Sequence, residues 1–155
     1  MKKLLKIVLL FYPFLIFGQN ITYEDLMQIE NSMQFERVVI ENNYENYQNY
    51  KKGEWGDHLI EYGYELEKNY ENKYVASSFA GYNKNNNRWW FQFHKNNPSS
   101  TSNYNYIFEK VKRRCSFVSV LDGGYACYKC PDSKYKGNIK FNKGSTWNTI
   151  SMGID

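Results

Sequence analysis

The sequence predicts a single α+β domain made of two consecutive halves, each with helices followed by an antiparallel sheet. Apolar residues repeat with a helical period in two separate regions, and segments of alternating polarity follow each of them. The motif "FERV" at Phe35–Val38 also recurs as "FEKV" at Phe108–Val111. We therefore expect the element order αα-βββ-α-ββββ, with the two halves related by tandem duplication.

Residues 1–18 are predicted to be a secretory signal peptide. Lys2, Lys3 and Lys6 precede an apolar stretch over 7–17, and Gly18 is a small residue at the expected cleavage site. An uncleaved anchor is the alternative, although the stretch is short for a membrane span. We expect residues 19–155 to form one secreted or periplasmic domain with no membrane span. Frequent Asn, Lys, Tyr and Ile indicate a bacterium with an AT-rich genome.

Charge is distributed unevenly along the chain. Without the signal peptide, 17 basic and 16 acidic residues remain, so the net charge of +1 gives no reason to expect nucleic-acid binding. Residues 19–72 contain 12 acids and 4 bases, whereas residues 73–155 contain 13 bases and 4 acids. The blocks could face each other, form an acidic and a basic side, or be ordinary solvated faces. We expect a monomer at moderate salt.

Two short helices are expected at the start of the domain. Thr22 and Asp25 match a capping box, which satisfies free N–H groups at a helix start. Ser32 is expected to cap the second helix, whose apolar side includes Phe35 and Val38. The segment 51–57 contains two glycines and no periodicity, so it is predicted to be a loop.

Three strands are expected next, at 58–67, 73–82 and 88–95. In the first, alternation places Ile60, Tyr62, Tyr64 and Leu66 on one face and Glu61, Gly63, Glu65 and Glu67 on the other. In the third, Trp89 and Trp90 face opposite sides, so one is expected in the core. The other could insert into a partner, as Trp often does at interfaces.

The second half is expected to begin after a loop over 96–103. A helix follows to Cys115, with Tyr104, Ile107, Phe108 and Val111 on one stripe and cationic residues in its last turn. Four strands are then predicted, at 117–121, 124–130, 135–141 and 147–152.

The cysteines Cys115, Cys127 and Cys130 lie close together in the second half. Asp122-Gly123 predicts a two-residue type I′ hairpin turn, which pairs Leu121 with Gly124. That register places Cys115 opposite Cys130, within disulfide reach. We predict a structural Cys115–Cys130 disulfide. A three-residue turn would instead place Cys115 opposite Pro131.

Two other uses of these cysteines are weighed against the disulfide. A redox Cys-x-x-Cys motif usually begins a helix, whereas Cys127 and Cys130 end a predicted strand. A zinc site would need His58 or His94 as a further ligand, and neither has ligand spacing. We expect no metal or cofactor, and we expect Cys127 to be a buried apolar residue opposite Val118, on the face of Val118 and Val120.

The sequence contains none of the common catalytic motifs, such as Gly-x-Ser-x-Gly or His-Glu-x-x-His. Catalysis is therefore the less favoured expectation. The residues considered for an interaction surface are Trp89, Trp90, Tyr62 and Tyr64. Glu61, Glu65 and Glu67 are considered for an acid/base site, against the commoner explanation of a solvated strand face.

The expected element order resembles the helix-pair-plus-sheet modules of the β-lactamase-inhibitor protein and of small outer-membrane assembly lipoproteins. The chain differs from the lipoproteins because no Cys follows its apolar stretch. We expect an exported protein-binding or inhibitor module whose partner is another protein. The alternatives are a component of cell-envelope assembly or structure, and a hydrolase with a carboxylate site. An aromatic patch beside the acidic strand would favour the first.

Overall fold

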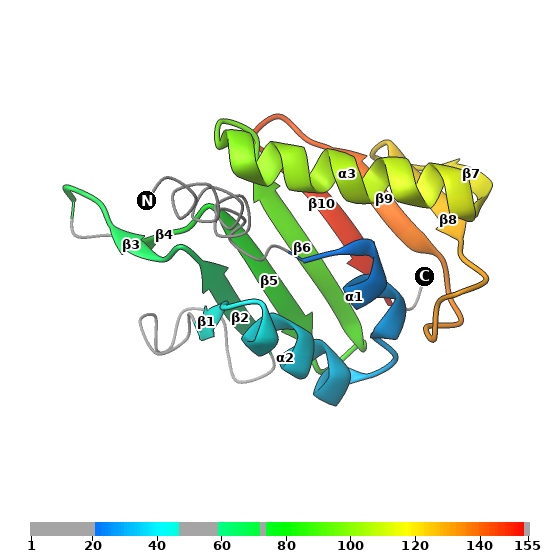
Figure 1. Ribbon diagram of the computed structural model, residues 1–155, viewed down its shortest axis with the longest axis horizontal. Coiled ribbons are helices and arrows are strands. Elements are labelled where there is room, and N and C mark those ends of the chain that lie inside the picture. Colours follow the sequence, from blue (N-terminus) through cyan, green and yellow to red (C-terminus); the bar gives the residue numbers. More distant parts are fainter. Residues whose placement is uncertain (1–20, 47–58, 72–73, 154–155) are drawn as a thin grey trace, which may run out of the picture.

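The computed structural model describes residues 21–46, 59–71 and 74–153 (Figure 1). It confirms the α+β class: helices pack on an eight-stranded antiparallel sheet with the order β1-β2-β5-β6-β10-β9-β8-β7. Strands β3 and β4 form a separate two-stranded ribbon. The predicted signal peptide at 1–18 and the predicted loop at 51–57 lie outside the described residues.

The element bounds are as follows. The helices are α1 (Tyr23–Gln28), α2 (Ser32–Glu41) and α3 (Pro98–Arg114). The strands are β1 (Glu45–Asn46), β2 (Leu59–Tyr64), β3 (Glu67–Lys68), β4 (Tyr74–Val75), β5 (Ser78–Asn83), β6 (Arg88–His94), β7 (Ser116–Leu121), β8 (Tyr125–Lys129), β9 (Ile139–Lys143) and β10 (Trp147–Met152).

Side-chain caps fix where the helices begin. The predicted capping box is present: Asp25 N donates to Thr22 Oγ1 (3.1 Å), and Thr22 N donates to Asp25 Oδ2 (2.9 Å). Helix α2 is capped by Asn31, one residue before the expected Ser32. The loop predicted over 96–103 is wrong from Pro98 onward. Asn97 caps α3, and a proline is well accommodated in a first turn, where its missing N–H has no helical partner.

All three helices cover the same face of the sheet (Figure 1). Phe35 of α2 packs against Tyr62, with ring centroids 6.2 Å apart, and against Phe91, with centroids 5.6 Å apart. Tyr104 of α3 packs against Phe93, with centroids 5.9 Å apart. These rings are all buried, so the core lies between the helices and this face.

The opposite face of the sheet, called the open face below, carries no described helix. Strand β6 alternates as predicted: Trp89, Phe91 and Phe93 are buried toward the helices, and Trp90, Gln92 and His94 are partly exposed. Because directly paired residues point to the same side of a sheet, the pairing of Trp147 with His94 places Trp147 on the open face.

The two halves of the sheet meet at their last strands, β6 and β10, which pair antiparallel. Each half contributes a helix with an aromatic residue on the core. Phe35 contacts the rings of Tyr62, Tyr82 and Phe91, and Phe108 contacts those of Tyr104, Tyr128 and Phe141. This arrangement is compatible with tandem duplication, which remains a prediction.

Near its turn, the β7–β8 hairpin pairs residues one position away from the predicted register. Next to the disulfide, the pairing is the predicted one. Leu121 pairs with Tyr125, so the turn has three residues, and Gly123 and Gly124 adopt φ values of 80° and 77°. The expected two-residue type I′ turn is wrong, because it needs a positive φ at Asp122, which Asp122 does not have.

A β-bulge between Phe117 and Ser119 then absorbs the extra residue, and Ser116 pairs with Lys129 as the shorter turn would require. Cys115 and Cys130 are therefore close, with Cα atoms 4.3 Å apart, and they form the predicted disulfide. Cys127 is buried as expected, but it lies opposite Ser119 instead of Val118. Val120 pairs with Ala126 and so lies on the other face.

Candidate functional site

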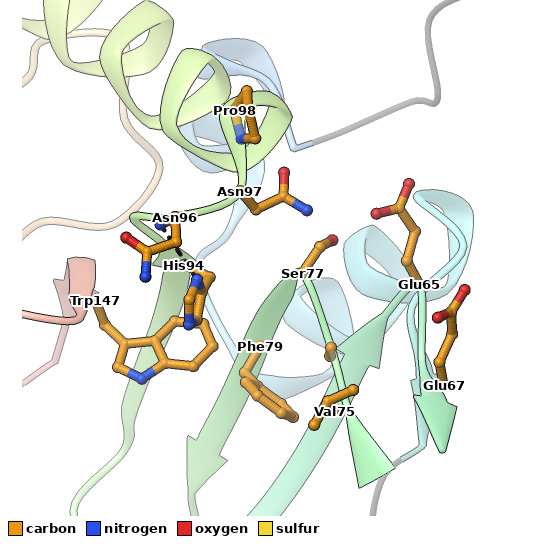
Figure 2. A pocket seen from close by; sticks show the side chains of 11 residues that line it. Glu65, Glu67, Val75, Ser77, Phe79, His94, Asn96, Asn97, Pro98 and Trp147 are labelled. Atoms are coloured by element: carbon orange, nitrogen blue, oxygen red, sulfur yellow. Dashed lines mark hydrogen bonds between the residues drawn. The ribbon is translucent and has the colours of Figure 1, made fainter. Parts of the chain in front are cut away.

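A groove with a volume of about 890 Å³ lies between the β3–β4 ribbon and the adjacent ends of β5, β6 and β10 (Figure 2). Its walls differ in chemistry. Phe79, His94 and Trp147 form an aromatic wall, and Glu65 and Glu67 lie across from them on the ribbon side. Sheet order and alternation bring the aromatic residues together, because β5, β6 and β10 are neighbours and these side chains all lie on the open face.

Ring contacts hold the aromatic wall in place. The centroid of Trp147 lies 4.7 Å from that of His94 with an interplanar angle of 89°. It lies 5.5 Å from that of Phe79 with an angle of 62°. Edge-to-face pairs of this kind are the favoured arrangement of aromatic rings. The indole of Trp147 is therefore supported from two neighbouring strands.

The orientation of His94 defines a hydrogen-bond donor at the wall. Its Nδ1 accepts from the backbone N–H of Asn96 (3.2 Å). A neutral imidazole that accepts through Nδ1 carries its proton on Nε2, so Nε2–H is left to donate. The backbone here is fixed by Ser77, whose carbonyl accepts from His94 N (3.1 Å) and from Ser100 Oγ (2.6 Å).

The acidic wall exists because β2 ends at Tyr64. Glu65 adopts a left-handed conformation with φ of 52°, and the chain turns into the ribbon, where Glu67 begins β3. Regular alternation predicted that Glu61, Glu65 and Glu67 share one strand face, and this is wrong beyond Tyr64. Glu61 stays within the sheet, paired with Gly81, whereas Glu65 and Glu67 line the groove.

Backbone and side-chain bonds fasten the ribbon to the sheet behind the groove. Ser77 donates to the Tyr64 carbonyl through its N–H (3.0 Å) and through its Oγ (3.3 Å). The neighbouring hydroxyls of Tyr44 and Ser78 are hydrogen-bonded at 2.8 Å, and burial raises the pKa of Tyr44. The polar groups below the groove floor are thus bonded internally, and Glu65 and Glu67 remain at its wall.

The structure places most of the residues first considered for an interaction surface in the core. Tyr62, Tyr64 and Trp89 are buried, and none of them lines the groove. Trp90 is partly exposed on the open face, where its indole covers Gly81 so closely that a Cβ there would collide with the ring. Trp90 therefore packs against the sheet and does not line the groove.

Sequence reasoning missed Phe79 and Trp147 as site residues. Alternation places His94 on the same face as Trp90, but it does not show which strands flank β6. The partner strand β10 is more than fifty residues away along the chain. The missing information was sheet order, which depends on the tertiary fold.

The disulfide excludes both alternative uses of the cysteines. Cys130 is bonded to Cys115, so Cys127 and Cys130 do not form a redox pair, and two of the three thiols are not free to bind zinc. Among the described residues, no three His, Cys, Asp or Glu side chains are arranged to hold a metal ion. None of the described helices is long and apolar enough to cross a membrane.

The groove contains a serine and a histidine, but not as a nucleophile and base. The hydroxyl of Ser77 is directed to the Tyr64 carbonyl, and the Nδ1 of His94 is occupied by Asn96 N–H. Nucleophilic catalysis requires the base to bond the attacking hydroxyl. The arrangement of aromatic rings facing carboxylates is suited to binding.

Fold and site together describe a single-domain α+β protein with helices on one face of the sheet and a groove on the other. Comparison of the chain with protein-family models, with curated proteins and with solved structures finds no match. The functional proposal therefore rests on the chemistry of the site.

Proposed function

We propose that the chain is an exported protein-binding module and that the open-face groove receives a segment of its partner. The observation that carries this proposal is the aromatic wall of Phe79, His94 and Trp147 across from Glu65 and Glu67 (Figure 2). An aromatic patch beside acidic residues is the feature expected to favour a binding module over the other classes, and the groove supports the proposal in this way.

The two walls indicate what the partner segment should carry. Trp147 supplies a large apolar surface at low entropic cost, a property typical of residues that dominate binding energy. Glu65 and Glu67 attract a lysine or arginine side chain, and a cation held over an aromatic face gains further stabilisation. We infer a segment in which a cationic residue adjoins an apolar one, with the His94 Nε2–H available to a backbone carbonyl.

The disulfide supports the exported location. Disulfides form and persist in oxidising compartments outside the cytosol, and the Cys115–Cys130 bond joins the residue before β7 to the residue after β8. Together with the predicted signal peptide at 1–18, it supports secretion or residence in the periplasm.

Site-specific photo-cross-linking tests this proposal. A photoreactive residue replaces Val75, which lies in the groove and is 44% exposed, in the full chain expressed in its source organism. The matched control replaces Ile40 on α2, which is 57% exposed and remote from the groove. We expect a protein adduct from position 75 that is absent from position 40 and is lost when Trp147→Ala is added. Identical adducts from both positions would contradict the proposal.

A second candidate is a hydrolase, because Glu65, Glu67 and His94 line one groove. The double variant Glu65→Gln/Glu67→Gln separates the two functions. A hydrolase would lose turnover of the cross-linked partner while still binding it, whereas a binding module would lose affinity and show no turnover in either form. If the adducts are cell-envelope proteins held in a stable complex, the protein belongs to envelope assembly instead.

A further inference from the structure

We propose that the outer edge of β7 pairs with an extended segment of another protein that carries acidic and aliphatic side chains. Strand β7 is the last strand of the eight-stranded sheet, and its residues do not line the groove between the ribbon and β5, β6 and β10 (Figure 1). The proposal therefore concerns a separate surface and does not depend on the function assigned to the groove.

Strand β7 is unusually apolar for an exposed edge. Its exposed large apolar side chains are Phe117 (59%), Val118 (49%), Val120 (63%) and Leu121 (41%). On one side β7 pairs with β8, and on its other side alternate backbone N–H and C=O groups point outward. Soluble proteins usually protect such edges with charges, prolines or short strands, and the other edge of this sheet, β1, has only two residues.

The β-bulge at Val118 gathers apolar side chains on one side of the edge. Phe117 pairs with Tyr128, and Val120 pairs with Ala126, so both lie on the helix-covered face. In a regular strand, residues three apart would point to opposite faces. The bulge thus brings Phe117 and Val120 together next to the end of α3. Bulges at sheet edges can re-aim side chains in this way.

The charges around this edge favour an acidic partner. The last turn of α3 contains Lys112 and Arg113, and one residue separates α3 from β7. Lys129 is exposed on β8, directly opposite Ser116. Within the part of the chain that the structure describes, neither Arg113 nor Lys129 forms a salt bridge. Glutamate or aspartate side chains on an added strand could pair with both.

The same charges disfavour a second copy of this chain at the edge. Residues 73–155, which include β7, β8 and β9, hold 13 bases and 4 acids. Edge-to-edge pairing of two copies would bring these basic halves side by side, which opposes association. An added strand from another protein gains main-chain hydrogen bonds along the edge and specificity from its alternate side chains.

The test uses a synthetic peptide with blocked ends that alternates valine and glutamate over about six residues, the usual length of a strand. Binding to the full mature chain is followed by NMR. We expect shifts and slowed amide exchange over Ser116–Leu121, because outward amides become hydrogen-bonded. Replacing glutamate with lysine should weaken binding at least about tenfold, and N-methylation of alternate peptide amides should abolish it.

Variants of the protein provide matched controls. Val120→Lys should abolish binding, whereas Ile40→Lys, at a similarly exposed aliphatic on α2, should leave it unchanged. Val120→Thr is the milder substitution if the lysine variant does not fold. The proposal is overturned by undetectable binding at millimolar peptide, by equal binding of the lysine or N-methylated peptide, or by shifts that spare β7 and fall away from the end of α3 and from β8. A dimer in solution that Val120→Lys dissociates would also overturn it, because the edge would then be occupied by a second copy.

Discussion

The single residue Glu65 lies where β2 ends and the groove begins. Its φ of 52° is a left-handed conformation that side chains other than Gly, Asn and Asp adopt at a cost of about 1 kcal/mol. The conformation turns the chain out of β2 and places Glu65 and Glu67 across from the aromatic wall. Under the proposed function, this unfavourable conformation is retained because it places both carboxylates at the groove.

We therefore expect two substitutions of Glu65 to differ in their effect on stability while both weaken partner binding. Glu65→Asn should be more stable than Glu65→Gln by about 0.5–1 kcal/mol, because asparagine tolerates left-handed backbone better than glutamine does. Both variants remove the charge, so both should weaken partner binding. Urea denaturation measures the stability difference. Equal stability of the two variants would show that the backbone at this position is not strained.

At the scale of elements, the β7–β8 hairpin reaches its disulfide by a route that the sequence did not predict. The three-residue turn shifts pairing by one residue, and the bulge at Val118 shifts it back. The turn is held by Asn142, whose Nδ2 donates to the Gly123 carbonyl (2.6 Å). The two irregularities compensate each other, so Cys115 still meets Cys130.

Deletion of Val118 tests this description of the hairpin. The pairs on both sides of the bulge, Ser119 with Cys127 and Phe117 with Tyr128, keep their partners when the extra residue is removed. We therefore expect the shortened chain to fold and to retain the Cys115–Cys130 bond, as shown by non-reducing peptide mapping. Loss of that bond would mean that Val118 is required for the register and is not an inserted residue.

Local rules predicted most of the fold from the sequence. Alternation in β6 and the capping box at Thr22 were correct, because each depends on residues close in the chain. The disulfide was also correct, but only because the bulge restores the register that the wrongly predicted turn would have changed. The predictions were wrong where one local sequence is compatible with two different structures. Pro98 is as compatible with a helix start as with a loop, and Asp122-Gly123-Gly124 allows a turn of two or three residues.

The candidate site was less accessible from sequence than the fold. Tyr62 illustrates one reason: its ring is buried, and its hydroxyl donates to Glu36 on α2 (3.0 Å), so an alternating tyrosine pattern does not reveal which face is exposed. The aromatic wall illustrates another, since Phe79 and Trp147 meet through sheet order. The acidic residues were recognised, but the break at Glu65 that positions them was not.

For the whole molecule, the sheet order separates the two charge blocks. The acidic segment contains α1, α2, β1, β2 and β3, whereas β7, β8 and β9 at the other end of the sheet belong to the basic segment. Within the described residues, Arg114 of α3 forms a salt bridge across the two segments with Glu24 of α1 (3.7 Å), and both side chains are about half exposed. Exposed salt bridges of this kind contribute little to the free energy of unfolding. The separation of acidic and basic residues should therefore matter more for partner recognition than for stability.

Buried tyrosines make the stability of the whole domain sensitive to alkali. Burial raises the pKa of Tyr44, Tyr62 and Tyr104 above the usual value of 10.0, with Glu36 adding to the effect at Tyr62. Above that pH the unfolded state loses tyrosine protons that the folded state keeps. The contribution of these tyrosines to the free energy of unfolding should therefore be constant below pH 10.0 and should fall as pH rises beyond that value.

Urea denaturation at several pH values around 10 measures this loss. Tyr62→Phe should reduce the slope of stability against pH, whereas Tyr70→Phe, at a side chain that is 95% exposed, should reproduce the wild-type slope. Because the comparison uses slopes, the hydrogen bond to Glu36 that is lost in Tyr62→Phe does not affect it. An unchanged slope in Tyr62→Phe would contradict the raised pKa.

The central claim is that the open-face groove binds a partner protein through Trp147, Glu65 and Glu67. It is tested most directly by the equilibrium affinity of the purified chain for the protein cross-linked through position 75. We predict that Trp147→Ala weakens binding by about tenfold or more, as expected for a residue that dominates an interface, and that Glu65→Gln/Glu67→Gln also weakens it. Ile40→Ala should bind as the wild type does. Wild-type affinity in both groove variants would contradict the claim.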